Sequence, residues 1–290
     1  MGLFDDLDMA SGDATERDEI LKPPFGWPGG KSKSVNQILH HLPYKPVYVE
    51  PFGGSYAVGL CRRPVKLEVC NDRYAGITDF YRCLRDTATF DALVARLGLT
   101  VYSREEFQWC KQTWENTSDP VERAARWYYM IQTSFSGLGR NFGRALSSNC
   151  AVAHKIRDKL PEFQAIHNRL KTVQLENQDW SHCIKDYDSE DTVFYIDPPY
   201  IDACKGIYKH ELDEAGHREL LGTIFGCKGF VALSGYAGNP VIDNNPWSEI
   251  FTWNAFISIE PVVNNERNNK DALNDVATRG VNRECLWIKY

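Results

Sequence analysis

The segment VFYIDPPYID, residues 193–202, places a carboxylate and a phenol directly after four apolar residues. Such a run is typical of a buried strand, and the two prolines that follow end the strand and stiffen the backbone. Asp197 and Tyr200 are then expected at the carboxyl edge of a sheet, where doubly wound folds bind ligands. The competing interpretation is an Asp-Pro-Pro turn that simply ends a strand, and for this tetrapeptide alone the two stand about equal.

The chemistry that suits this corner is methylation of a planar exocyclic amine, which is a poor nucleophile because its lone pair is delocalised into the ring. The Asp197 carboxylate and the carbonyl of Pro198 are expected to accept both N–H hydrogens and to favour a pyramidal nitrogen, and Tyr200 is expected to stack on the base. No metal or tuned histidine is needed, since the sulfonium of S-adenosylmethionine is already a strong methyl donor and the work is mainly positioning.

A second candidate segment, VYVEPFGGSYAVGL at residues 47–60, runs from a strand through a glycine turn into an apolar helix. Glycines there allow close approach of a cofactor, and Glu50 at the strand tip is placed to meet an ammonium group. Asp72 lies about 20 residues beyond the turn, where an acid typically holds ribose hydroxyls. Asp179 ends the next strand and is placed to accept from the adenine amine of a cofactor. A plain turn and two helix caps remain the alternatives.

The stretch FGWPGGKSKSVNQIL, residues 25–39, looks like a phosphate-binding loop, but its spacing is wrong. The pattern G-x-x-x-x-G-K-[ST] requires glycine where Phe25 stands, and Gly26 comes one place too late. A polar, acidic segment precedes the stretch, where a phosphate-binding loop follows a buried strand. We therefore do not expect nucleotide hydrolysis.

Segments rich in β-branched and aromatic residues predict strands at 47–50, 66–72, 172–179, 193–196 and 230–236. Helical patterns separate them at 75–85, 154–170 and 216–225. This alternation predicts an α/β fold with a doubly wound, mostly parallel sheet. Two further strands, expected at 248–259 and 284–290 with no helix after them, fit a final antiparallel hairpin.

The interval 75–171 is far longer than a βαβ crossover needs, so it is expected to be an inserted helical domain between 21–74 and 172–290. Its most irregular piece, TSFSGLGRNFGRALSS at 133–148, is predicted to be an exposed loop or ribbon. Residues 1–20 are acidic and are expected to be disordered. The polar stretch 264–282 is expected to be mobile.

The net charge of −6 equals the charge of the first 20 residues, so the rest of the chain is neutral. Within it, residues 123–171 hold nine bases and two acids, a basic field of the kind that phosphates seek, although a solvated helix face explains it equally well. Nine cysteines lie singly without a CxxC pair, which indicates neither disulfides nor a zinc site. No apolar run approaches a membrane span and no secretory signal is present, so a cytoplasmic location is expected.

Three motifs, taken in order, closely resemble the Dam-like DNA adenine-N6 methyltransferases: Gly26 to Lys31, then Glu50 to Gly54, then after a long insertion Asp197 to Tyr200. The resemblance extends over nearly the whole chain beyond the acidic tail, down to the terminal ECLWIKY strand. It implies a seven-stranded Rossmann-like methyltransferase sheet with an inserted target-recognition domain. It also implies S-adenosylmethionine as cofactor, no metal, and duplex DNA as partner with the target adenine flipped out.

The resemblance assigns residues to three groups. Those implied for the cofactor are Trp27, Gly29, Gly30, Lys31, Glu50, Phe52, Gly53, Gly54, Asp72 and Asp179, with Lys31 alternatively serving DNA. Those implied for the target base are Asp197, Pro198, Pro199 and Tyr200. Those implied for DNA are Arg140, Asn141, Phe142 and Arg144, by arginine contacts and an aromatic wedge, against the alternative of a basic loop held by Phe142 packing.

One departure from the family pattern is Tyr56, which stands where a second glycine is usual, two positions after Gly54. The same machinery also serves the N4 amine of cytosine and RNA substrates, so these remain alternatives. A catalytically inactive DNA-binding relative is a further alternative, against which the intact Asp197 and Tyr200 argue.

Overall fold

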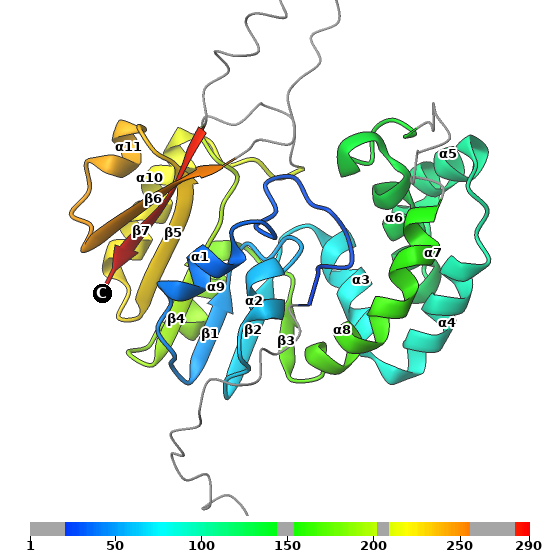
Figure 1. Cartoon of the computed structure of the whole chain (residues 1–290), viewed down its shortest axis with the longest axis horizontal. Helices are drawn as coiled ribbons and strands as arrows, with labels where there is room; N and C mark the ends of the chain where they lie inside the picture. The colour runs from blue at the N-terminus through cyan, green and yellow to red at the C-terminus, as the bar shows by residue number, and fades with distance from the viewer. Residues whose placement is uncertain (1–20, 144–153, 202–208, 256–281) are drawn as a thin grey trace, which may run out of the picture.

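A seven-stranded sheet forms the centre of the molecule, in the order β3-β2-β1-β4-β5-β7-β6 (Figure 1). This computed structural model describes residues 21–143, 154–201, 209–255 and 282–290; the predicted tail 1–20, Arg144 and most of the polar stretch 264–282 lie outside them. The strands are β1 (Val47–Glu50), β2 (Leu67–Asn71), β3 (Val173–Glu176), β4 (Thr192–Ile196), β5 (Phe230–Tyr236), β6 (Glu249–Ala255) and β7 (Asn282–Lys289). The first five are parallel and β7 pairs antiparallel with β6, as predicted, and β7 also pairs antiparallel with β5.

Helices cover both faces of the sheet because alternate side chains of each strand point to opposite sides. In β1, Tyr48 packs in one hydrophobic cluster and Val49 in the other. The helices outside the long insertion are α1 (Val35–His40), α2 (Ala57–Cys61), α9 (Trp180–Tyr187), α10 (Glu214–Gly226) and α11 (Pro240–Asp243). The second cluster draws on α9, α10 and α11, and the first on α1, α2 and the insertion, so the sheet is doubly wound.

The segment between β2 and β3 is helical: α3 (Ala75–Arg85), α4 (Thr87–Gly98), α5 (Arg104–Thr113), α6 (Pro120–Thr133), α7 (Lys155–Lys159) and α8 (Phe163–Leu170). The single helix predicted at 154–170 is wrong, because a 3₁₀ turn at Leu160–Glu162 divides it. Pro161 lacks the N–H that a continuous helix needs. Aromatic rings fill the centre of this segment, where Phe80 and Tyr128 stack with centroids 4.6 Å apart.

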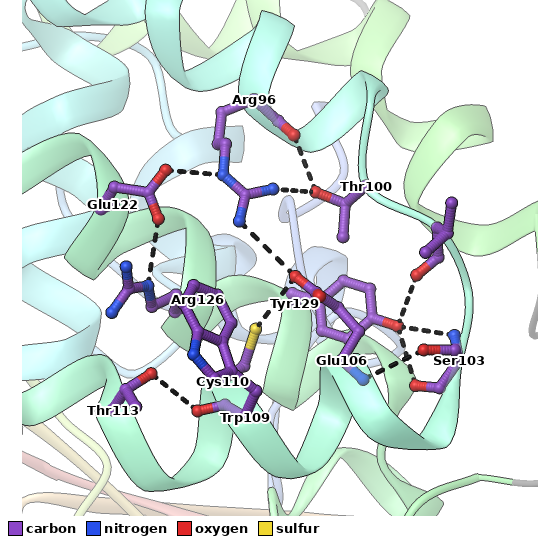
Figure 2. Close-up of polar contacts among 11 residues, drawn as sticks. Arg96, Thr100, Ser103, Glu106, Trp109, Cys110, Thr113, Glu122, Arg126 and Tyr129 are labelled. Carbon is purple, nitrogen blue, oxygen red and sulfur yellow. Dashed lines mark hydrogen bonds and ion pairs between the residues drawn. The ribbon is translucent and has the colours of Figure 1, made fainter.

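A polar network joins three of these helices (Figure 2). Arg96 of α4 donates to Glu122 of α6 at 2.6 Å and forms an ion pair with Glu106 of α5 at 3.5 Å. Arg126 donates to the other Glu122 oxygen at 3.0 Å, and its guanidinium lies 4.0 Å from the centroid of the Trp109 ring. The network therefore joins α4, α5 and α6. It also pairs the charges of Arg96 and Arg126 with acidic side chains of the same three helices.

The last helix of the insertion is fixed to the sheet by a buried ion pair. Arg169 of α8 donates to both oxygens of Glu68 on β2, at 2.7 and 2.5 Å, and Glu68 is 0% exposed. The same guanidinium donates to the carbonyl of Gly59 in α2 at 2.7 Å. Charge pairing and hydrogen bonding thus join α8, α2 and β2 at one point.

Candidate active site

The DPPY motif leaves the sheet at the end of β4, whose five residues are all buried. Pro198 is buried, while Asp197, Pro199 and Tyr200 are half-buried. His217 of α10 is buried behind the motif and donates from Nε2 to the carbonyl of Pro199 at 2.9 Å. The two prolines and this hydrogen bond hold Asp197 and Tyr200 at the carboxyl edge of the sheet, where the sequence predicted them.

The GWPGGK turn reaches the same corner through Lys31. Its ammonium donates to Asp197 Oδ2 at 2.8 Å and to the carbonyl of Gly29 at 2.6 Å, and the residue is only 5% exposed. Gly30 closes the turn by donating to the carbonyl of Trp27 at 2.9 Å. Burial acts to lower the pKa of Lys31, but the charges of Asp197 and Glu284 outweigh it and raise the pKa above its usual value. Lys31 is therefore a protonated partner of Asp197.

Asp197 is the meeting point of this corner, and its side chain is 18% exposed. Burial raises its pKa above the usual value, against the opposing charge of Lys31. The Tyr200 hydroxyl donates to Asp197 Oδ1 at 3.0 Å, and the Tyr200 ring packs edge to face against Tyr236 with centroids 4.7 Å apart. A small hollow beside the motif is lined by Tyr200, Ile201, His217, Ser234, Gly235, Tyr236, Asn239 and Ile242.

The structure adds Glu284 of β7, which sequence reasoning missed. Its Oε1 lies 3.5 Å from the Lys31 ammonium and 3.4 Å from the Tyr200 hydroxyl, and its Oε2 accepts from Ser34 Oγ at 3.2 Å. The available signal was a charged residue within the apolar strand ECLWI. A buried carboxylate in such a strand needs a partner, and Lys31 is that partner.

The glycine turn after β1 is held by Asp72 at the end of β2. Asp72 accepts from the backbone N–H of Gly54 at 2.9 Å and of Tyr74 at 2.8 Å. Gly54 has φ +50°, and a Cβ there would lie 2.9 Å from the Trp27 ring, so both its conformation and its neighbour require glycine. Burial raises the pKa of Asp72 to about 6, although its two hydrogen bonds oppose the shift. Trp27, Gly54 and Asp72 are thus brought together.

The structure shows how Tyr56 is accommodated at the position where the family pattern has glycine. It has φ +52°, and among the described residues it is the one non-glycine residue with a positive φ. The backbone therefore keeps the left-handed conformation that glycine adopts freely. The Tyr56 ring is fully buried against Gly59, where a Cβ would lie 2.2 Å from Tyr56 Cζ. The missing side chain at Gly59 makes room for the extra one at position 56.

Glu50, Phe52 and Gly53 lie at the same edge. Glu50 accepts from the Tyr48 hydroxyl at 2.7 Å, and burial raises its pKa to about 8, which favours the neutral acid at neutral pH. Gly53 donates from its backbone N–H to the carbonyl of Asn71 at 2.7 Å. Phe52 stacks on Trp180 of α9 with centroids 6.2 Å apart. A contact of Glu50 with an ammonium group stays a prediction.

Asp179 caps α9, as one of its two interpretations held. It accepts from the backbone N–H of Ser181 at 3.1 Å and lies 3.2 Å from Arg73. Partial burial acts to raise its pKa, but the Ser181 hydrogen bonds and the Arg73 charge prevail and lower it. Asp179 is therefore an ionised acceptor at the strand edge, one strand beyond Asp72.

The irregular segment of the insertion folds back on itself through an antiparallel bridge between Ser134 and Phe142. Phe142 packs inward against Tyr102 and Phe107, with ring centroids 4.9 and 5.7 Å away. These contacts agree with the alternative prediction, in which Phe142 packing holds a basic loop in place. Phe135, which sequence reasoning missed, is 62% exposed. Arg140 and Asn141 are also exposed on this loop.

A groove of about 160 Å³ is lined by residues of this loop and of the GWPGGK turn, together with Tyr74, Ile131 and Lys209; the loop and turn residues are Trp27, Pro28, Gly137, Leu138 and Arg140. The Lys209 ammonium lies 5.2 Å from the centroid of Tyr74. Among the described residues, five of the nine bases in the segment 123–171 form ion pairs, some of them at exposed positions: Arg123, Arg126, Arg157, Lys159 and Arg169. Arg140 keeps an exposed side chain at the groove.

Within the four described ranges, no cluster of three or more His, Cys, Asp or Glu residues is arranged to hold a metal ion. The same ranges contain no helix with the length and apolar character needed to cross a bilayer.

Several known proteins are similar to this chain. The modification methylase LlaI of Lactococcus lactis subsp. lactis is 24% identical over 245 residues, which are 73% of this chain and 38% of the relative. The type II methyltransferase M1.LlaDCHI of Lactococcus lactis subsp. cremoris is 29% identical over 199 residues, 62% of this chain and 66% of the relative. The DNA N-6-adenine-methyltransferase of Escherichia phage P1 is 26% identical over 186 residues, 63% of this chain and 24% of the relative. The chain thus spans from about a quarter to two thirds of these relatives.

A sequence profile of the D12 class N6 adenine-specific DNA methyltransferases matches residues 27–237. The match begins at Trp27 in the GWPGGK turn, includes the glycine turn and the DPPY motif, and ends just after β5. These motifs are the ones that the fold brings to a single edge of the sheet. The chain therefore belongs to the D12 class of N6 adenine-specific DNA methyltransferases.

Proposed function

We propose that this protein transfers the methyl group of S-adenosylmethionine to the N6 amine of an adenine flipped out of duplex DNA. The observation that carries the proposal is the buried contact of Lys31 with Asp197 beside Tyr200. It joins the first and last motifs of the family at the carboxyl edge of β4, where a doubly wound sheet binds its ligands.

Asp197 and Pro198 are the proposed acceptors of the target amine. Each Asp197 oxygen accepts one hydrogen bond, from Lys31 or from Tyr200, so the carboxylate keeps lone pairs for an amine N–H. With the Pro198 carbonyl as second acceptor, the nitrogen lone pair is directed away from the ring plane. When bound, the cofactor supplies an electrophilic methyl group and leaves as the thioether. Asp197 also lies where it can accept the proton that the methylated nitrogen releases.

The residues at the edge of β1, β2 and β3 fit a donor that carries an adenosine. Asp72 and Asp179 are carboxylates at the ends of neighbouring strands, suited to ribose hydroxyls and to an adenine amine. The Phe52 ring stacks on Trp180, the residue that follows Asp179. Trp27 packs so closely on Gly54 that a Cβ there would collide with its ring, so the two proposed cofactor-binding turns are in direct contact. Glu50, Gly53, Gly29 and Gly30 complete this proposed cofactor site.

The insertion 75–171 is the proposed target-recognition domain, and its irregular loop is the proposed DNA contact. Arg140 is suited to guanine edges or phosphates, and Asn141 to a base edge. Phe135 is better suited than Phe142 to occupy the space of a flipped base, because it is exposed and Phe142 is not. Arg144 is proposed from sequence alone.

Adenine is preferred over cytosine as the target because the matched family and the phage relative are both described as adenine-specific. The test is incubation of the purified protein with labelled methyl donor and duplex DNA, followed by digestion to nucleosides. Label in N6-methyl-2′-deoxyadenosine is the expected result. Label in N4-methyl-2′-deoxycytidine would transfer the proposal to the cytosine amine, and absence of label would reject it in favour of an inactive relative.

A further inference from the structure

Glu284 occupies a fixed place in the fold. The register of β7 sets it opposite Tyr236 of β5 and Trp253 of β6. Its side chain shares a face of the strand with Leu286 and Ile288, which pack in the same hydrophobic cluster as α1 and the insertion. A charged residue among such neighbours must be compensated, so its contacts are informative.

The compensation comes from the corner that holds the DPPY motif. One ammonium, Lys31, lies within ion-pair distance of two carboxylates, Asp197 at 2.8 Å and Glu284 at 3.5 Å. The cluster therefore carries one surplus negative charge in a setting where Lys31 and Glu284 are nearly excluded from solvent. If Lys31 paired with Asp197 alone, the pair would carry no net charge beside the target amine.

We propose that Glu284 is a positioning residue for methyl transfer, which shares Lys31 with Asp197 and so leaves a surplus negative charge beside the Asp197 carboxylate that receives the target amine. The inference rests on the proposed function, because it assigns Asp197 to the amine. Positive charge develops on the target nitrogen as the new bond forms, so surplus negative charge beside it stabilises the transition state more than the ground state.

Other polar groups surround the cluster. They are the Tyr200 hydroxyl, which lies between the two carboxylates, Tyr195 from β4, Tyr236 from β5 and Glu50 from β1. Glu50 is held toward its neutral form by burial. The Glu284 charge acts to raise the pKa of Asp197, and the Lys31 charge acts to lower it. Removing the Glu284 charge is therefore expected to lower the pKa of Asp197.

The experiment compares wild-type protein with Glu284→Gln, Glu284→Asp and Ser34→Ala. Glu284→Gln removes the charge and keeps the size, Glu284→Asp keeps the charge, and Ser34→Ala removes the donor to Glu284 Oε2 with the charge unchanged. Transfer of labelled methyl to duplex DNA is measured from pH 5 to 9 as kcat and KM. Two further readouts need no turnover: calorimetric binding of S-adenosylhomocysteine, and fluorescence of 2-aminopurine at the target position, which reports base flipping.

For Glu284→Gln we expect kcat to fall at least tenfold with little change in KM, cofactor-product affinity or flipping signal. The acid limb of the pH profile, where Asp197 takes up a proton, should move to lower pH. Glu284→Asp should recover most of kcat, and Ser34→Ala should keep the acid limb of the wild type.

Two results would overturn the inference while the wild type still methylates adenine. The first is a kcat for Glu284→Gln within twofold of wild type and an unmoved acid limb. The second is a lower melting temperature together with weaker S-adenosylhomocysteine binding and a smaller 2-aminopurine flipping signal, while the acid limb of the pH profile does not move. That combination would indicate a purely structural role. A wild type that methylates no nucleoside would instead reject the proposed function itself, and the inference with it.

Discussion

Replacing Arg169 by methionine should destabilise the protein far more than any loss of a surface charge. The substitution leaves the Glu68 carboxylate, which is 0% exposed, without its bidentate partner, and it removes the donor to the Gly59 carbonyl. Breaking one side of a buried ion pair typically costs about 3–5 kcal/mol. At about 2–4 °C per kcal/mol for a large domain, the melting temperature should fall by roughly 6–20 °C.

The assay is thermal and urea unfolding followed by circular dichroism, with two comparison variants. Arg157→Met removes an exposed arginine whose pair with Asp158 is 73% and 59% exposed, and it should change stability by less than about 1 kcal/mol. The double variant Arg169→Met with Glu68→Met replaces the whole pair by apolar side chains and should recover most of the loss. An Arg169→Met protein within about 1 kcal/mol of wild type would refute the reasoning, as would a double variant less stable than the single one.

Four further predictions concern the site. Asp197→Ala should abolish methyl transfer to DNA, because it removes the proposed acceptor of the target amine. Calorimetry should show S-adenosylhomocysteine binding within about threefold of wild type, a change in binding free energy below the ~1.4 kcal/mol that corresponds to tenfold. Arg140→Ala should weaken DNA binding in a fluorescence titration by about 1–3 kcal/mol and leave cofactor-product affinity unchanged. Tyr56→Phe should leave the urea midpoint unchanged or raise it, because the Tyr56 hydroxyl is buried without a hydrogen-bond partner among the described residues. Cofactor affinity should decline as pH falls through about 6, where Asp72 takes up a proton and ceases to be an anionic acceptor, and Asp72→Asn should flatten this dependence.

Local patterns in the sequence predicted the parallel strands well, because each is a short β-branched run that ends at a turn. The strand at 172–179 was predicted too long, since Asp179 begins the next helix. The helix at 154–170 was predicted as one piece because its apolar spacing continues through Pro161, although proline interrupts it. The first difference is at the end of an element, where hydrogen-bond partners rather than periodicity set the boundary, and the second is a proline interruption within one.

The site was predictable as far as its motifs are local. Asp197 and Tyr200 follow directly from a strand and two prolines, and Gly54 from a strand-to-helix turn. The contact of Lys31 with Asp197 spans 166 positions, and its extension to Glu284 depends on how β7 pairs with β5. Likewise, the charge of residues 123–171 suggested a surface for phosphates, because the sequence does not reveal that Arg123 and Arg169 are paired with acids elsewhere in the chain.

The cluster around Lys31 brings together residues that the ribosome synthesises at very different times. Roughly 250 positions separate Lys31 from Glu284. At about 5–20 residues per second of synthesis, the ribosome needs roughly 13–50 s between these two residues. During that interval the nascent chain can form at most the Lys31–Asp197 contact, because the Glu284 carboxylate has not yet been synthesised. The proposed methyl transfer should therefore become possible only after β7 has inserted between β5 and β6.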